Sequence, residues 1–274
     1  MLTCSQNLLA RKKIIYDAEA LYTLRQFEQR QLKGETISTQ EREKLIAEEI
    51  NLARQSDRII AVSAREKQRF NERGYQNVTV LGHALNPIFT PNNFHQRQHI
   101  LFVGSIYELE SPNADSILWF SKEIFPLIQA ELGQEVNLLV AGNNTVEEIK
   151  QKIKQLQNDS IEMLGKVDDL KDLYNQTRLF VAPTRFAAGI PHKVHEAAAY
   201  GLPVVTTPLI AAQLEWEDEI DLLVADNSKV FAQQCVKLYR DAQLWERLRL
   251  NSLKKIESQC SPESFQATLK QILE

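Results

Sequence analysis

The sequence predicts an α/β fold built on a doubly wound parallel sheet of the Rossmann type, and three observations support this class. Short apolar runs alternate along the chain with segments whose apolar residues recur at helical spacing. The runs are continuously apolar, as expected for strands whose two faces are both covered by helices. Only short loops separate the runs from the helical segments, which favours right-handed crossovers between parallel strands.

The first 90 residues supply three of these strands. They are predicted at 12–17 (KKIIYD), 58–63 (RIIAVS) and 78–85 (VTVLGHAL). A long polar stretch, 19–56, separates the first two strands. It contains apolar residues at helical spacing, namely Leu45, Ile46, Ile50 and Leu52.

A further helix is predicted directly after the second strand. Ser63 suits its N-cap, and Glu66 three residues later would complete a capping box. Gly74 lies where a C-terminal glycine should end the helix. Local chemistry therefore predicts both ends of this helix.

A domain boundary is predicted after the third strand. Residues 86–98 contain two prolines and three asparagines and show little periodicity, which is typical of a linker. We therefore divide the chain into a first domain at 1–90, a linker at 91–98 and a second domain at 99–274.

The second domain repeats the strand–helix pattern more regularly. Six strands are predicted, at 99–105, 136–142, 161–167, 178–184, 203–207 and 220–226. Helices are predicted between them, at 113–132, 145–157, 168–176, 193–200 and 208–215. The tail from 228 to 273 is predicted to be helical, with a break near Ser261 and Pro262. Trp119, Phe120 and Phe125 lie at helical spacing and are predicted to be core residues.

Composition and charge exclude several classes of protein. Hydrophobic residues make up 43% and charged residues 25% of the 274, which is ordinary for a globular protein. No apolar run approaches the roughly 18 residues of a membrane span, and the N-terminus does not follow the order of a secretory signal. The net charge of -4, without a concentrated basic segment, argues against a nucleic-acid partner. We expect a cytoplasmic protein.

The cysteines point to reduced thiols rather than to a disulfide or a metal site. Cys4, Cys235 and Cys260 are odd in number and widely spaced, and none belongs to a CxxC pair. His192 and His195 lie three residues apart on one predicted helix, but no third ligand type clusters with them, which favours surface or interface histidines. Metal is therefore not expected.

The candidate site lies beyond the carboxyl ends of the strands, where parallel sheets bind ligands. Gly104 and Ser105 follow the first strand of the second domain, and Lys166 and Val167 follow the third. Asp168 and Asp169 come next, and simple N-capping of the following helix explains them. The richest segment is 185–205, RFAAGIPHKVHEAAAYGLPVV.

Two interpretations of segment 185–205 remain open on the residues alone. Gly189 and Pro191 form a tight loop before a helix, whose first N–H groups and dipole favour an anion. Lys193 would then face a phosphate, and Glu196, one turn along, would suit the paired hydroxyls of a ribose. Alternatively, the loop is ordinary turn chemistry and the two charged residues form a surface pair.

Three longer motifs carry a family resemblance. They are GSIYELESPNADSILWFSKEIFPLI, IEMLGKVDDLKDLYNQTRLFVAPT and RFAAGIPHKVHEAAAYGLPVVTT, in this order. Together they resemble the donor-binding domain of the family 4 (group 1) glycosyltransferases, and the resemblance covers about residues 99–270. Residues 12–90, with Glu48 and Glu49 on a helix, resemble the end of the acceptor-side domain of the same family.

The resemblance implies a GT-B architecture of two Rossmann-like domains, the first of them truncated. It implies transfer of a sugar, with retention, from a nucleoside-diphosphate sugar to an unidentified glycan, lipid or small-molecule acceptor, without a metal or other cofactor. Since the first domain would lack its neighbouring strands, its open sheet edge favours a homo-oligomer or a partner that supplies the missing part.

The resemblance also assigns roles to ten residues. Gly104 and Ser105 would line the phosphate end of the donor, and Lys166 and Val167 would frame the base. Gly189, Ile190 and Pro191 would bind the diphosphate, with Arg185 and Lys193 as charge partners. Glu196 would bind the ribose. Ala188 departs from the family's Glu-x7-Glu motif, whose first glutamate would fall at this position. The departure puts direct sugar contact by this loop in doubt, but not nucleotide binding.

The alternative function is a non-catalytic or partner-dependent nucleotide-sugar-binding fragment that lacks the acceptor site. A Rossmann oxidoreductase is disfavoured, because neither glycine-containing strand end carries GxGxxG followed by an acidic residue about 20 positions on.

Overall fold

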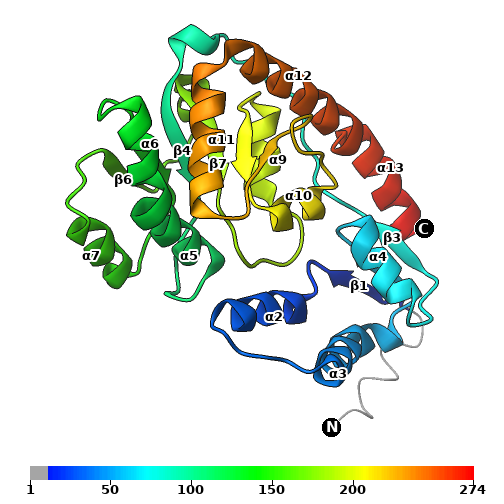
Figure 1. The fold of residues 1–274 in the computed structure, drawn as a ribbon. Coiled ribbons are helices and arrows are strands. Elements are labelled where there is room, and N and C mark those ends of the chain that lie inside the picture. Colours follow the sequence, from blue (N-terminus) through cyan, green and yellow to red (C-terminus); the bar gives the residue numbers. More distant parts are fainter. Residues whose placement is uncertain (1–11) are drawn as a thin grey trace. The chain divides into compact units, whose positions relative to one another are not determined.

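The computed structural model describes residues 12–274, which group into two compact units (Figure 1). The first unit comprises the described part of Met1–His83 together with Ala187–Ile190 and Pro262–Glu274. The second comprises Ala84–Phe186 and Pro191–Ser261. Both are α/β units with parallel sheets, which confirms the predicted fold class.

The first unit contains a three-stranded parallel sheet in the order β1-β2-β3. The strands are Ile15–Ala18, Arg58–Ala61 and Val78–Val80. Its helices are α2 (Tyr22–Leu32), α3 (Thr39–Ile50), η1 (Asn51–Gln55), α4 (Ala64–Asn71) and α13 (Pro262–Leu273). The three predicted strands are therefore confirmed, each a few residues shorter than the apolar run that predicted it.

The capping box predicted for α4 forms only in part. Ser63 Oγ accepts a hydrogen bond from Glu66 N (3.2 Å), as expected of an N-cap. The Glu66 side chain does not return the bond, and the prediction was wrong on this point. It is buried, and its Oε1 accepts from Leu21 N (3.3 Å), the residue that precedes α2. The start of α2 has no side-chain cap of its own, so its exposed N–H groups attract carboxylates from other helices.

Helix α13 supplies part of the first unit. Ile272 is buried, and the Lys13 ammonium donates a hydrogen bond to its carbonyl (3.1 Å). The sequence placed this helix at the end of the second domain, whereas in the structure it clusters with the first unit. The predicted break near Ser261 and Pro262 coincides with the change of unit.

The second unit is built on six parallel strands in the order β6-β5-β4-β7-β8-β9. In chain order they are β4 (Gln98–Val103), β5 (Leu138–Ala141), β6 (Ile161–Gly165), β7 (Thr177–Ala182), β8 (Val204–Thr206) and β9 (Leu223–Val224). All six predicted strands are present. Because the chain builds outward from β4 in one direction and then from β7 in the other, the strand order reverses between these two neighbours.

Helices precede, connect and follow these strands, and Figure 1 shows β4 and β7 enclosed among them. They are η2 (Phe94–Gln96), α5 (Pro112–Trp119), η3 (Phe120–Ile124), α6 (Phe125–Leu132), α7 (Glu147–Gln155), α8 (Lys171–Gln176), α9 (His192–Ala199), α10 (Pro208–Leu214), α11 (Ser228–Arg240) and α12 (Ala242–Gln259).

Two helices depart from their predicted course. The segment predicted as one helix at 113–132 contains the π-turn η3. Pro126 has no N–H to offer the preceding turn, which accounts for the widened backbone there. The helical tail has an additional break at Asp241, whose carboxylate accepts hydrogen bonds from Gln243 N (3.0 Å) and Leu244 N (2.9 Å) and starts α12.

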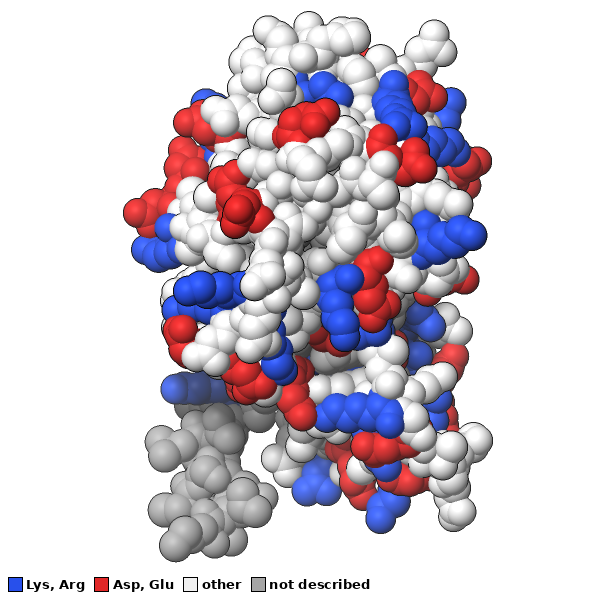
Figure 2. Space-filling model, turned by 60° about the vertical axis from the view of Figure 1, so that its left-hand side comes forward, with Lys and Arg blue, Asp and Glu red and all other residues white. Residues whose placement is uncertain are grey.

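Each unit has its own hydrophobic core. In the second unit, Trp119, Phe120 and Phe125 are buried, as predicted. Cys235 and Cys260 are buried free thiols, also as predicted, and Cys4 lies outside the described residues. Over residues 12–274, every helix is too short or too polar to cross a membrane. On the face shown in Figure 2, basic and acidic side chains are intermingled.

Candidate functional site

The strand order places the candidate site beyond β4 and β7. Ligands of open parallel sheets bind outside the carboxyl ends of the strands where the order reverses. Gly104 and Ser105 continue the chain directly from β4, and Thr184 and Arg185 lie just beyond the end of β7. The second unit thus brings the segment after β4 and the segment after β7, which both carry predicted site residues, to one end of its sheet.

Three glycines form the backbone floor at this end of the sheet. Gly104 N donates to Ala141 O (2.9 Å), and Gly142 N donates to Gly165 O (2.8 Å), so the ladder continues past the strands. A Cβ on Gly142 would lie 2.4 Å from Gly104 O, and its φ of +138° is unfavourable for other residues. The segments at Gly104 and Gly142 therefore approach each other more closely than any side chain at Gly142 would allow.

Lys193 lies beside this floor, in the first turn of α9. Its Nζ donates to Asn113 Oδ1 (2.7 Å) and lies 4.8 Å from the centre of the Phe102 ring. The Asn113 amide in turn donates to Ser105 O (2.9 Å). Burial lowers the pKa of Lys193 to about 8.

The Lys193 ammonium has no carboxylate partner among residues 12–274. Lys193 lies in the first turn of α9, which carries the positive end of the helix dipole and is therefore unfavourable for a cation. An anion bound at this point would pair with the lysine and lie at the positive end of the helix dipole. This arrangement favours the first interpretation of segment 185–205 over an ordinary surface pair.

Arg185 is engaged by other side chains. Its guanidinium binds the Asp115 carboxylate through two hydrogen bonds, of 2.9 and 2.5 Å, and lies 4.9 Å from the Trp119 ring centre. Such a bidentate pair is among the stronger side-chain interactions. Its predicted role as a charge partner of a diphosphate therefore requires that it serve Asp115 at the same time, and the role stays a prediction.

Glu196 lies one turn along α9 in an aromatic setting. Its side chain is 30% exposed, and its Oε2 is 3.9 Å from His192 Nδ1. Burial, together with the nearby Glu196 carboxylate, raises the pKa of Tyr174. The Tyr174 ring is stacked on Tyr200 at 4.7 Å. The carboxylate is accessible and has room to accept hydrogen bonds from a ligand.

The loop before α9 is divided between the two units. Gly189 and Ile190 cluster with the first unit and Pro191 with the second. Gly189 has a φ of +77°, and within the first unit a Cβ there would lie 3.0 Å from Glu19 O. The glycine is therefore required by the backbone itself, whether or not a ligand approaches it.

Lys166 and Val167 follow β6, at the edge of the sheet. The Lys166 side chain is 74% exposed and pairs with Asp168 (2.8 Å). The predicted N-capping by Asp168 and Asp169 was wrong in position, because the N-cap of α8 is Leu170, which makes no side-chain capping bond. Asp169 Oδ1 does accept a hydrogen bond from Lys171 N (2.9 Å), the first residue of the helix. An exposed lysine side chain is consistent with a role carried by backbone groups, which remains a prediction.

His195 departs from its prediction as a surface or interface residue. It is buried, its Nδ1 lies 3.7 Å from Cys260 Sγ, and its ring centre is 5.7 Å from that of Trp216. The α9 side that carries it faces the core, so only His192 lies at the surface. Within the described part of the chain, no cluster of three potential metal ligands occurs.

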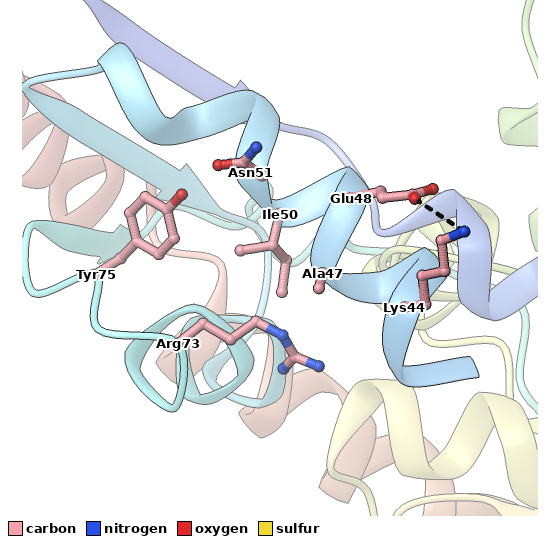
Figure 3. Close-up of a pocket in the computed structure, with 7 residues that line it drawn as sticks. All are labelled: Lys44, Ala47, Glu48, Ile50, Asn51, Arg73 and Tyr75. Atoms are coloured by element: carbon pink, nitrogen blue, oxygen red, sulfur yellow. Dashed lines mark ion pairs between the residues drawn. The ribbon is translucent and has the colours of Figure 1, made fainter. Parts of the chain in front are cut away.

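Two surface hollows lie apart from these residues. One, of about 440 Å³, is drawn in Figure 3 and is lined by Lys44, Ala47, Glu48, Ile50, Asn51, Arg73 and Tyr75 of the first unit. Its charges are already paired, Lys44 with Glu48 (3.9 Å) and Arg73 with Glu43 (2.7 Å). The other, of about 530 Å³, lies in the second unit between α6 and α11. None of the ten predicted site residues lines either hollow.

Sequence analysis missed Asn113 and Asp115. Both lie in the first turn of α5 and contact the two predicted cations, Lys193 and Arg185. The only available signal was the polar first turn of α5, the first helix after β4. Such residues are usually explained by helix capping.

The chain is similar to known glycosyltransferases. The family model for glycosyl transferases group 1 matches residues 97–241. No curated protein matches the sequence. The structure of Anabaena HepE in complex with UDP and glucose is 16% identical, with a TM-score of 0.70, over 97% of this chain and 73% of that one.

Two further structures extend the similarity. WaaG, a glycosyltransferase of lipopolysaccharide biosynthesis, is 14% identical with a TM-score of 0.68, over 98% of this chain and 80% of that one. A mutant of S. aureus TarM is 14% identical with a TM-score of 0.70, over 84% of this chain and 46% of that one. This chain therefore spans less than half the length of TarM. At these identities the similarity concerns the fold, which is that of the GT-B enzymes.

Proposed function

This chain belongs to the group 1 glycosyl transferases, and on that premise we propose that it transfers a sugar from a nucleoside-diphosphate sugar to an acceptor hydroxyl. The donor would bind beyond β4 and β7 of the second unit. We further propose that transfer proceeds with retention of configuration and that protein groups rather than a metal stabilise the leaving diphosphate.

The observation that carries this proposal is the Lys193 ammonium. It is a partly desolvated cation at the start of a helix, at the point where strand order reverses, without a carboxylate to neutralise it among the residues described. Negative charge grows on the diphosphate as the glycosidic bond breaks. A fixed cation and the positive end of the helix dipole stabilise that charge more in the transition state than in the ground state.

Glu196 fits the same ligand. The Glu196 side chain is partly exposed and can accept hydrogen bonds from ribose hydroxyls. HepE and TarM have been solved in complex with UDP. A uridine nucleotide is therefore the first donor class to test here.

Thermal shift measurements with UDP-, GDP-, ADP- and dTDP-sugars test donor binding. A ligand at about one hundred times its dissociation constant should add roughly 2.7 kcal/mol to the stability. Transfer of radiolabelled sugar from the best donor to candidate glycan, lipid and small-molecule acceptors then tests the reaction. If no nucleotide sugar stabilises the protein, the proposed function is wrong.

A second candidate is a nucleotide-sugar-binding protein that transfers sugar only with a partner, or not at all. The observation that favours it is Ala188, which stands where the family motif has its first glutamate. Binding of a donor without transfer to any acceptor, alone or in an oligomer, would favour this candidate.

Glu196→Gln should weaken nucleoside binding about tenfold, because the amide keeps the shape but loses a charge-assisted hydrogen bond of about 1.5 kcal/mol. Calorimetry with uridine and with 2′,3′-dideoxyuridine measures this effect. The variant should bind the dideoxy compound as the unaltered protein does. Equal losses for the two ligands would show that the carboxylate does not bind the ribose hydroxyls.

A further inference from the structure

We propose that Asn113 is a positioning residue for Lys193, a neutral amide that holds the ammonium at the end of β4 without cancelling its charge. The charge then remains available to the diphosphate of the donor. That the charge serves the diphosphate rests on the proposed function. That Asn113 positions the ammonium concerns the protein alone and can be tested without any ligand.

The partners of Asn113 fix the orientation of its amide. Its nitrogen must face Ser105 O at 2.9 Å, because a carbonyl oxygen can only accept. Its oxygen must then face Lys193 Nζ at 2.7 Å, because an ammonium can only donate. One side chain from α5 thus joins the end of β4 to the first turn of α9, and neither bond tolerates a flipped amide.

Gly104 supplies the space that Asn113 occupies. A Cβ on Gly104 would lie 2.7 Å from Asn113 Cγ and 2.9 Å from both terminal atoms of the amide. Gly104 therefore admits the asparagine to the strand end. This is a structural requirement that exists before any phosphate binds, in addition to the predicted role of Gly104 in the donor site.

The neutrality of the amide distinguishes Asn113 from its neighbours. A carboxylate at the same distance would form an ion pair with Lys193 and satisfy it. Asp115, two residues along α5, is instead bound by Arg185 through both of its oxygens. The ammonium is left with an amide oxygen and the face of the Phe102 ring, both of which orient a cation while leaving its net charge.

The charged groups on the surrounding elements are few. Strand β4 contributes only the apolar Phe102 face, α5 carries Asp115, and the loop after β7 carries Arg185, which binds that aspartate. On α9 itself, His192 and Glu196 lie 3.9 Å from each other. Burial is accordingly the cause that lowers the pKa of Lys193.

The test replaces Asn113 by aspartate and by alanine in the full chain. The pKa of Lys193 is measured by NMR with 13Cε-labelled lysine and is assigned with Lys193→Met. We expect Asn113→Asp to raise the pKa of Lys193 from about 8 towards that of a free lysine. In Asn113→Ala the ammonium loses its acceptor, so the pKa of Lys193 should fall below about 8, and an unchanged pKa would contradict the proposal.

Calorimetry with UDP and with uridine provides the second readout. Asn113→Asp should lower the affinity for UDP at least tenfold at pH 7 and leave that for uridine unchanged. The affinity of the unaltered protein for UDP should fall above pH 8, whereas in Asn113→Asp the fall should begin at higher pH. A residue with a purely structural role would not move this profile.

The control is Asn251→Asp on α12. The Asn251 amide also donates to a backbone carbonyl, Ile220 O at 2.8 Å, in an exposed hydrogen bond. This variant should leave both readouts unchanged. If Asn113→Asp leaves the pKa of Lys193 unchanged, the proposal for Asn113 is overturned, and Asn113→Ala decides if the aspartate variant does not fold. If the unaltered protein does not bind UDP, the donor class fails while the pKa measurement still decides the role of Asn113.

Discussion

Lys193→Met should lower the affinity for nucleoside diphosphates about 10- to 150-fold and leave the affinity for nucleosides unchanged. A hydrogen bond to a charged group contributes about 1.5–3 kcal/mol, and tenfold in affinity corresponds to about 1.4 kcal/mol. Methionine preserves the packing on the Phe102 ring while removing the charge. Calorimetry with UDP and uridine measures the difference between the two ligands.

A matched substitution, Lys150→Met on α7, separates this effect from a general loss of positive charge. Lys150 is exposed and pairs with Glu147 (3.3 Å), so its removal should change neither affinity. The loss caused by Lys193→Met should also disappear at high pH. Since the pKa of Lys193 is about 8, the unaltered lysine is itself neutral well above that value. An equal loss of affinity for UDP and uridine would show that Lys193 contacts the nucleoside or stabilises the fold rather than binding the diphosphate.

Gly142→Ala should destabilise the second unit by about 2 to 6 kcal/mol and abolish donor binding. An unfavourable φ costs about 1–3 kcal/mol and an overpacked contact about the same again. The new Cβ would meet Gly104 O at 2.4 Å, which is backbone and cannot move aside without separating β4 from β5. Thermal unfolding measures the loss of stability, which should exceed about 4 °C in melting temperature.

Gly165→Ala is the control for this prediction. Gly165 ends the neighbouring strand with a φ of +70°, but its Cβ would meet no atom within 4 Å. Gly165→Ala should lower the free energy of unfolding only by the cost of the left-handed backbone conformation, about 1–2 kcal/mol. Equal destabilisation by the two variants would mean that the close approach at Gly142 adds nothing.

Much of the fold could be predicted because it is encoded locally. Continuous apolar runs such as the one at 178–184 indicate buried strands wherever they occur, and Ser63 caps α4 through a residue three positions away. The glycine-ended strands and the loop before α9 also identified the end of the sheet where the candidate site lies. Nearest-neighbour chemistry was sufficient for these features.

The remainder depends on contacts between residues far apart in sequence. Glu66 was expected to bind its own N-cap, yet it serves the start of α2, 45 residues away. His195 has the same local pattern as an exposed histidine, and only the packing of Cys260 and Trp216 makes it a core residue. Asn113 and Lys193 are 80 positions apart, so no local pattern could indicate that they meet.

The position of α13 has a consequence for folding during synthesis. The entire second unit is translated between β3 and this helix, and its contacts are available as soon as Ser261 has left the ribosome. The first unit, by contrast, cannot bury Ile272 or bind its carbonyl to Lys13 until α13 has emerged. Units generally fold in the order in which they emerge. Here the earlier strands must wait for the later helix, so the first unit is completed last although its synthesis begins first.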